Sequence, residues 1–235
     1  MYMDSVLVAA NLLSACATGT LVISTTRPCK LSNVPYLLGI PAGFGLITCG
    51  YLAETIASVG IPNTGFFLNF IYLITQTYGL LFLGFTYARR TRLRLIGEST
   101  PIELAVAVLV TLILFVPVFA SPVSVSPDRL PVGIELFLRT IAVLLTCYLI
   151  YETARNWTFS QKAVEGYVVI GFVLLIVGHI GFILAALGMG IIAVFLGYEG
   201  RLVGLFMLNA VVLVGVKKDD FMMMLKRLGL AAMAH

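Results

Sequence analysis

Long apolar runs, separated by short polar or turn-forming segments, dominate this chain of 235 residues. Each run has about 20 residues or more, the length of a helix that crosses a hydrocarbon core of roughly 30 Å. The pattern predicts an all-α protein with seven transmembrane helices, and it lacks the short alternating segments of a membrane β-barrel. The predicted spans cover residues 5–26, 36–58, 65–88, 101–121, 132–154, 163–187 and 190–217.

Composition supports the membrane class. Hydrophobic residues make up 60% of the chain and charged residues 11%, whereas a soluble domain carries about 25% charged residues. The chain therefore has too little polar surface to cover a soluble fold, and we expect a multi-pass protein of the cell membrane. No basic segment precedes the first apolar run, so we expect a retained first helix and not a cleaved signal peptide.

The basic residues are distributed unevenly along the predicted loops. Of the 15 lysines and arginines, only Arg129, Arg139 and Arg201 fall on the side that also holds the N-terminus. Cytoplasmic loops carry the excess of Lys and Arg, so the pattern predicts an N-terminus outside and a C-terminus in the cytoplasm. The basic loop at 89–94 fits this anchoring role, and we expect no nucleic-acid partner.

The chain shows signs of an internal duplication at an offset of 128 residues. The matching glycines are Gly43 with Gly171, Gly50 with Gly178, and Gly60 with Gly188. Because a single helix connects the copies, both copies have the same orientation, which predicts a parallel 3+1+3 repeat. Sites in such repeat proteins lie near the midplane between the copies. The predicted units are residues 1–95, a linker helix and outer loop at 96–131, residues 132–218, and a tail at 219–235.

The last junction and the tail have their own patterns. The segment Gly-Met-Gly at 188–190 is so short that it predicts a tight hairpin between the sixth and seventh helices. In the alternative, the seventh helix begins near Arg201 and residues 188–200 form a loop. The tail at 219–235 places Phe221, Leu225 and Leu228 on one helical face. This predicts an amphipathic helix on the cytoplasmic membrane surface.

The 3+1+3 plan resembles that of the SWEET sugar transporters, and retinal proteins also have seven helices with the N-terminus outside. The string GFVLLIVGH at 171–179 is similar to seven-helix sensor regions of prokaryotic membrane proteins. This resemblance implies a bundle that moves or senses a small molecule. The SWEET proline pattern is not reproduced, since Pro41 matches Val169 in the second copy. The seventh helix carries Lys217 only at its end, which disfavours a retinal Schiff base.

Ionisable groups inside a bilayer are costly and usually face the bundle interior or water. Glu135 and Arg139 are four residues apart and can pair on one helix. Glu199 and Arg201 lie about 200° apart around the helix, so one of them needs a partner elsewhere. The set predicted to line an outward-facing polar cavity and bind a ligand comprises Glu54, Asn69, Gln76, Glu135, Arg139, His179, Glu199 and Arg201.

Structural roles compete with this hypothesis. In the structural alternative, Gln76 and Asn209 only form hydrogen bonds between neighbouring helices. His179 is then a hydrogen-bonded histidine inside the bundle. The second histidine, His235, lies at the opposite membrane face. The chain has no metal-ligand cluster and no nucleophile motif. We therefore expect no catalytic residue, no metal, no cofactor and no enzymatic activity.

The leading hypothesis is a membrane protein that binds a small ligand in the outward-facing cavity and transports it. The alternative is a non-catalytic membrane subunit, or a sensor or platform component of a larger complex. The expected partners are membrane lipid, a small ligand of unknown identity and a protein at the cytoplasmic tail. A homo-oligomer is also compatible with the sequence.

Overall fold

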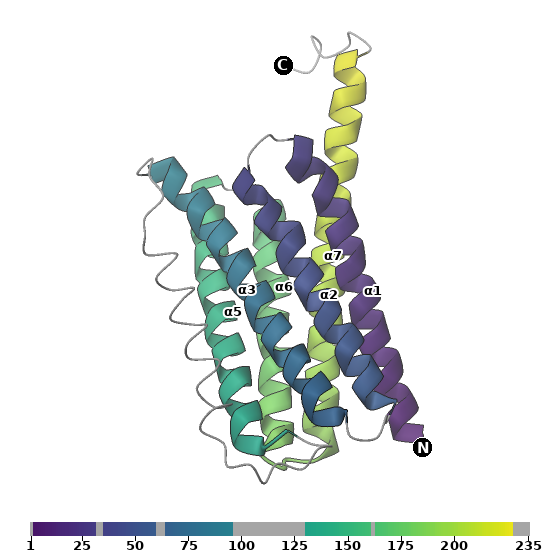
Figure 1. The fold of residues 1–235 in the computed structure, drawn as a ribbon. Coiled ribbons are helices and arrows are strands. Elements are labelled where there is room, and N and C mark those ends of the chain that lie inside the picture. Colours follow the sequence, from purple (N-terminus) through teal and green to yellow (C-terminus); the bar gives the residue numbers. More distant parts are fainter. Residues whose placement is uncertain (1, 32–34, 60–63, 96–129, 161–162, 228–235) are drawn as a thin grey trace.

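The computed structural model describes residues 2–31, 35–59, 64–95, 130–160 and 163–227, and the regular elements among them are all helical (Figure 1). One of them, η1, is a short 3₁₀ helix between the first two long helices. The elements are α1 (Tyr2–Leu31), η1 (Pro35–Leu38), α2 (Gly39–Ser58), α3 (Gly65–Leu95), α5 (Val132–Ser160), α6 (Ala163–Ala186) and α7 (Ile191–Arg227).

Within the described residues, six helices, and not seven, are long and apolar enough to cross a membrane. They correspond to predicted spans one to three and five to seven, while the fourth predicted span, 101–121, lies outside the described residues. Several helices run past the predicted edges, as α3 does to Leu95. The residues added there are mostly Arg, Thr and Leu, and none is Gly or Pro, so the helix continues beyond the apolar stretch.

The tight hairpin between α6 and α7 is confirmed. Gly188 and Gly190 both adopt a φ of 83°, a left-handed conformation that glycine enters without steric cost. The backbone N–H of Met189 bonds to the carbonyl oxygen of Leu184 at 3.0 Å, which closes the end of α6. The alternative start of the seventh helix near Arg201 is wrong, since α7 begins at Ile191.

The six helices form a closed ring in which each packs mainly on two neighbours, in the order α1, α2, α3, α5, α6, α7 and back to α1. Two seams, α3 with α5 and α1 with α7, join the two groups of three helices. Exchanging the groups exchanges these seams, which is the packing that the predicted parallel repeat requires. The repeat itself stays a prediction.

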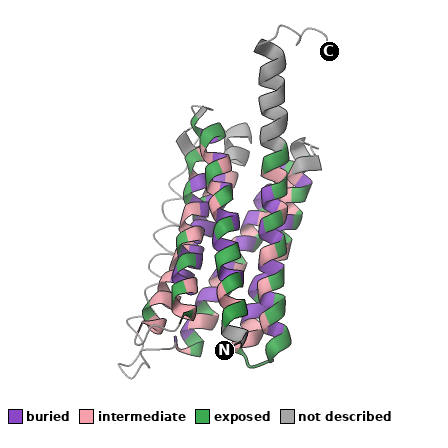
Figure 2. Ribbon diagram, turned by 90° about the vertical axis from the view of Figure 1, so that its right-hand side faces the viewer, coloured by how far each residue is buried: buried purple, intermediate pink, exposed green. Residues whose placement is uncertain are grey.

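Large apolar side chains face outward along the whole ring (Figure 2). Ile23 and Ile192 are more than three-quarters exposed, and Phe67 and Leu144 nearly two-thirds. Exposed apolar surface of this extent is rare on water-soluble monomers, whereas lipid is its natural surrounding. The arrangement is compatible with a multi-pass membrane protein.

The interior of the ring contains many polar side chains. Its buried hydroxyl groups mostly satisfy themselves by donating to a carbonyl oxygen four residues back in their own helix. These hydroxyls belong to Ser14, Thr18, Thr25, Thr77, Thr146 and Thr153. The buried groups that need partners on other helices are therefore the amides and the charges.

Glycines bring α6 and α7 into backbone contact at the level of Arg201. A Cβ atom added to Gly178 would lie 2.8 Å from the Arg201 backbone nitrogen, and one added to Gly200 would lie 2.7 Å from the nitrogen of Gly178. Small residues of this kind let membrane helices approach closely. This contact fixes the position of Arg201 along the axis of α6.

The end of α7 differs from the predicted separate tail helix. α7 continues without a break to Arg227, so residues 219–227 extend the seventh helix and do not form one of their own. The segment 216–227 contains neither Gly nor Pro and is rich in Met and Lys, which are strong helix formers. Residues 228–235 of the predicted tail lie outside the described residues.

Candidate functional site

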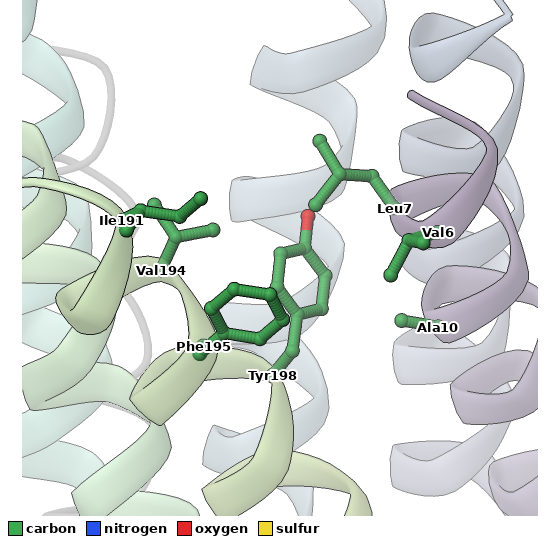
Figure 3. A pocket seen from close by; sticks show the side chains of 7 residues that line it. All are labelled: Val6, Leu7, Ala10, Ile191, Val194, Phe195 and Tyr198. Carbon is green, nitrogen blue, oxygen red and sulfur yellow. The ribbon is translucent and has the colours of Figure 1, made fainter. Parts of the chain in front are cut away.

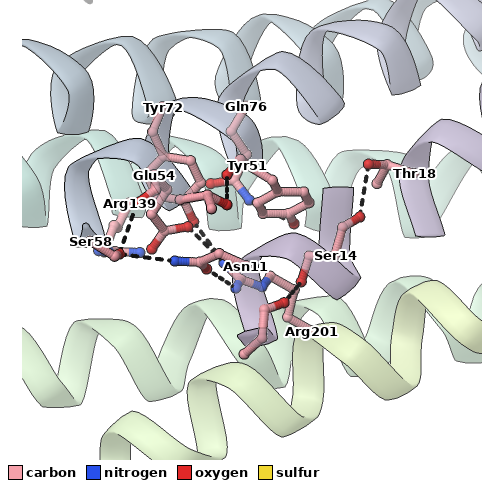
Figure 4. Close-up of polar contacts among 12 residues, drawn as sticks. Asn11, Ser14, Thr18, Tyr51, Glu54, Ser58, Tyr72, Gln76, Arg139 and Arg201 are labelled. Carbon is pink, nitrogen blue, oxygen red and sulfur yellow. Dashed lines mark hydrogen bonds and ion pairs between the residues drawn. The ribbon is translucent and has the colours of Figure 1, made fainter. Parts of the chain in front are cut away.

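Arg201 lies at the centre of the ring with only 2% of its surface exposed. It follows the start of α7 by ten residues, which is a rise of about 15 Å, or half of a hydrocarbon core. Its Nη1 atom forms an ion pair with Glu54 Oε2 on α2 at 3.0 Å (Figure 4). We expected that either Glu199 or Arg201 needs a partner elsewhere, and Arg201 is the one that has a partner on another helix.

Two more helices contribute hydrogen bonds to the same guanidinium group. Nη1 donates to the Tyr72 hydroxyl on α3 at 3.4 Å, and Nη2 donates to Asn11 Oδ1 on α1. The Asn11 amide in turn donates to Ser58 Oγ at 3.3 Å. Arg201 thus joins α7 to three helices of the other half of the ring, while its Nε atom has no partner within the described part of the chain.

Aromatic rings enclose the Arg201 guanidinium group. Its central carbon lies 4.5 Å from the centre of the Tyr51 ring, 4.7 Å from Tyr198 and 5.3 Å from Phe182. Each such contact stabilises a cation by about 0.5–2 kcal/mol, more where water is excluded. The rings therefore replace part of the hydration that the buried charge has lost.

A second buried arginine, Arg139, also contacts Phe182. Arg139 on α5 is 7% exposed, and its Nε and Nη2 atoms both bind Glu135 Oε1 at 2.8 Å. The predicted pairing of Glu135 with Arg139 is confirmed. The Arg139 central carbon lies 4.7 Å from the Phe182 ring centre and 6.0 Å from that of Tyr72, so both arginines share the same aromatic neighbours.

Gln76 on α3 completes this group. Its Nε2 atom donates to the Tyr51 hydroxyl at 3.4 Å, which confirms an interhelical bond, while its Oε1 atom has no partner in the ranges that the structure describes. We call the assembly the Arg201 cluster. It consists of Asn11, Tyr51, Glu54, Tyr72, Gln76, Glu135, Arg139, Phe182, Tyr198 and Arg201.

Three buried polar atoms of the Arg201 cluster lack a partner among the described residues: Arg201 Nε, Arg139 Nη1 and Gln76 Oε1. A buried group left unpaired costs about 1–3 kcal/mol, and native structures contain few of them. Such atoms are commonly satisfied by a bound water, ion or ligand. The cluster thus has two free donor groups and one free acceptor.

The other predicted site residues are placed as follows. His179 on α6 is 5% exposed, and no hydrogen bond joins its imidazole to another described residue. Asn69 is half-buried, one turn from Tyr72 towards the start of α3. Glu199 is exposed on the outside of α7. Because residues two apart on a helix point in nearly opposite directions, an inward Arg201 places Glu199 outward, away from the Arg201 cluster.

The predicted set of site residues left out five members of the cluster, namely Asn11, Tyr51, Tyr72, Phe182 and Tyr198. Asn11 is fully buried and binds Arg201, and its signal was a lone amide within the first apolar run. Phe182 and Tyr198 pack edge to face with ring centres 4.9 Å apart. Aromatic residues are common in apolar helices, so no feature of the sequence distinguished these two.

An apolar cavity of about 290 Å³ lies between α1 and α7, near the start of α7 (Figure 3). The side chains that line it carry a single polar group, the hydroxyl of Tyr198, which also belongs to the Arg201 cluster. The lining residues are Val6, Leu7, Ala10, Ile191, Val194, Phe195 and Tyr198. The charged side chains of the cluster do not line this cavity and are packed against one another beside it.

Comparison with known proteins gives no information on function, so the function must be argued from the geometry of the Arg201 cluster. No protein-family model matches the chain, and neither a curated protein nor a solved structure matches it. Within the described ranges, no group of three or more His, Cys, Asp or Glu side chains is placed to hold a metal ion.

Proposed function

We propose that this chain is an integral membrane protein that binds a small polar ligand in the Arg201 cluster and carries it across the membrane. The predicted seven-helix topology, with the N-terminus outside and a parallel repeat, is the setting for this proposal. The observation that carries it is the meeting of buried charged and amide groups from both halves of the ring, with three polar atoms unpartnered.

Stability alone gives a weak account of the Arg201 cluster. Replacing a buried ion pair by apolar residues of similar size is often neutral or stabilises a protein by about 1–4 kcal/mol. An arginine at the centre of a membrane helix costs about 2.5–3.5 kcal/mol even by insertion measurements. Interior ionisable groups in membranes commonly mark ligand or ion pathways, which supports a binding role for Arg201.

The place of the cluster in the ring supports transport over simple binding. Glu54 comes from the first group of three helices and Arg201 from the second, so their contact spans the two halves. Repeat transporters bind substrate near the midplane between their halves and expose it by moving one half against the other. The buried side chains described above correspond to a closed state, with access given by motion at the two seams.

Cysteine accessibility tests this proposal. In a variant with the four natural cysteines replaced, Gln76→Cys should react with a membrane-impermeant thiol reagent added from either face of a vesicle. Leu80→Cys is the matched control: it lies one turn away on α3 and is 2% exposed, against 4% for Gln76, but it is in the apolar core. Reaction from one face alone would support binding without transport. No reaction at Gln76→Cys from either face would contradict the proposal.

A second candidate function is a membrane subunit or sensor component, and the length of α7 favours it. The apolar span of α7 ends at Val214, but the helix continues for 13 more residues to Arg227, which adds about 20 Å. A helix that projects from the bundle offers a place for a second protein to bind (Figure 1). Deleting 219–235 should then remove a partner that purifies with the full chain from its native membrane, while leaving ligand binding unchanged.

A further inference from the structure

The charges of the Arg201 cluster are not balanced among its buried members. The side chains of Arg201, Glu54 and Arg139 are 3%, 10% and 8% exposed, whereas that of Glu135 is 27% exposed. The deeply buried set therefore contains two positive charges and one negative charge. Its remaining counter-charge, Glu135, stands in the first turn of α5 at the predicted outer end of the ring.

The two arginines contact the same aromatic ring, that of Phe182. Both guanidinium carbons lie close to the Phe182 ring centre, at 4.7 Å and 5.3 Å, so they cannot be further apart than these two distances together. Each has one nitrogen without a partner among the residues that the structure describes, Arg139 Nη1 and Arg201 Nε. The free acceptor, Gln76 Oε1, belongs to the same cluster. An anion placed among these groups would meet two charged donors.

The ion pair between Glu135 and Arg139 has features that allow a ligand to displace Glu135 from Arg139. Two nitrogens of Arg139 bind the same oxygen, Oε1, so the pair does not use the two-oxygen fork that makes arginine–carboxylate pairs strongest. A partly exposed carboxylate also regains hydration when it leaves its partner, which a fully buried one does not. Glu135, and not Glu54, is therefore the carboxylate that a ligand would displace.

We propose that the ligand of the Arg201 cluster is a small monocarboxylate that replaces Glu135 on Arg139 and is held at the same time by Arg201. This inference rests on the ligand-binding function proposed above. One negative charge neutralises the buried set, whereas a dianion would leave a net negative charge in a low-dielectric site and a cation would be repelled. A hydroxyl group on the ligand would donate to Gln76 Oε1.

A panel of matched carboxylates and amides tests the class of ligand. Acetate, lactate and benzoate are added at millimolar concentrations to the purified full chain in lipid nanodiscs, each beside acetamide, lactamide or benzamide. The measurements are the thermal unfolding midpoint and the dissociation constant from calorimetry. At least one carboxylate should raise the midpoint and bind, and its amide, which has the same shape but no charge, should not.

Two substitutions give opposite expected results. Glu135→Gln removes the competing carboxylate and should tighten binding of the active carboxylate by about fivefold, since a partly exposed ion pair of up to about 1 kcal/mol no longer has to be broken. Arg139→Gln should abolish binding. Glu199→Gln makes the same chemical change on the outside of α7 and should leave the dissociation constant unchanged. The unfolding midpoint without probe shows whether each variant is folded.

Weaker binding in Glu135→Gln would overturn the exchange, because Glu135 would then support the ligand instead of competing with it. Equal binding of an amide and its carboxylate, or no effect of any carboxylate in the panel, would overturn the ligand class. Binding of the amides alone, lost in Arg201→Ala, would leave the ligand-binding function standing with a neutral ligand. Failure of Gln76→Cys to react from either face would instead overturn transport, whatever the panel shows.

Discussion

Replacing Glu54 by glutamine should destabilise the bundle by about 3 kcal/mol, because it leaves the buried charge of Arg201 without its counter-ion. At the 3.0 Å separation of this pair, the Coulomb attraction is roughly 5 kcal/mol for an effective dielectric constant of about 20. Glutamine can still accept a hydrogen bond from Arg201, so the loss should fall below that figure. For a chain of this size the unfolding midpoint should drop by about 6–12 °C.

The fluorescence of the single tryptophan, Trp157 on α5, can follow thermal unfolding in one fixed detergent. Glu199→Gln is the matched control, because it removes a carboxylate from an exposed position and should not lower the midpoint. The double variant Glu54→Gln, Arg201→Gln removes both charges and should be more stable than Glu54→Gln alone. With the single variant Arg201→Gln measured as well, the coupling of the pair is the stability change of the double variant minus the changes of the two single variants.

Two results would refute this reasoning. If Glu54→Gln unfolds at the wild-type temperature, Arg201 is not balanced by Glu54 in the folded protein. If the double variant loses as much stability as the two single variants added together, the two residues act independently and the ion pair is not formed. Either result would remove the basis for the Arg201 cluster as a single unit.

Other consequences of the packing can be measured by the same unfolding experiment. Gly178→Ala should lower stability by about 1–3 kcal/mol, since its new methyl group would press on the Arg201 backbone nitrogen; Gly133→Ala, with nothing within 4 Å of its added Cβ, should be neutral or stabilising. Equal effects of the two would contradict close contact between α6 and α7. Asn209→Leu removes bonds to Thr20 and to the α1 backbone and should cost about 1 kcal/mol, whereas an unchanged midpoint would show that the bonds add no stability.

The sequence predicted the helices because span length and apolar content are local properties. Predicting which side chains meet also needs the order of the helices around the ring and the rotation of each about its axis. Apolar helices give little information on rotation, because a helix that is hydrophobic all round shows no clear buried face. For this reason the sequence indicated that Glu199 or Arg201 needs a partner, but it did not show which of them does or identify Glu54 and Asn11 as partners of Arg201.

The rotation of α7 nevertheless left a trace in the sequence. Gly197 and Gly204 lie four residues before and three residues after Arg201, so they share its side of the helix. Small residues mark the face where membrane helices approach, and this face packs on α6. The same pattern places Glu199 outside, which the predicted set of site residues did not take into account.

The continuous α7 helix connects the buried ion pair at Arg201 to Arg227, so that motion at one end is passed to the other. From Arg201 to Arg227 the helix advances 26 residues without a proline, a rise of about 39 Å. A rigid rod of that length acts as a lever, and a tilt of about 5° at Arg201 moves its far end by roughly 3 Å. A change of partner at Arg201 that tilts α7 would therefore displace Arg227 by more than it displaces the part of the helix near Arg201.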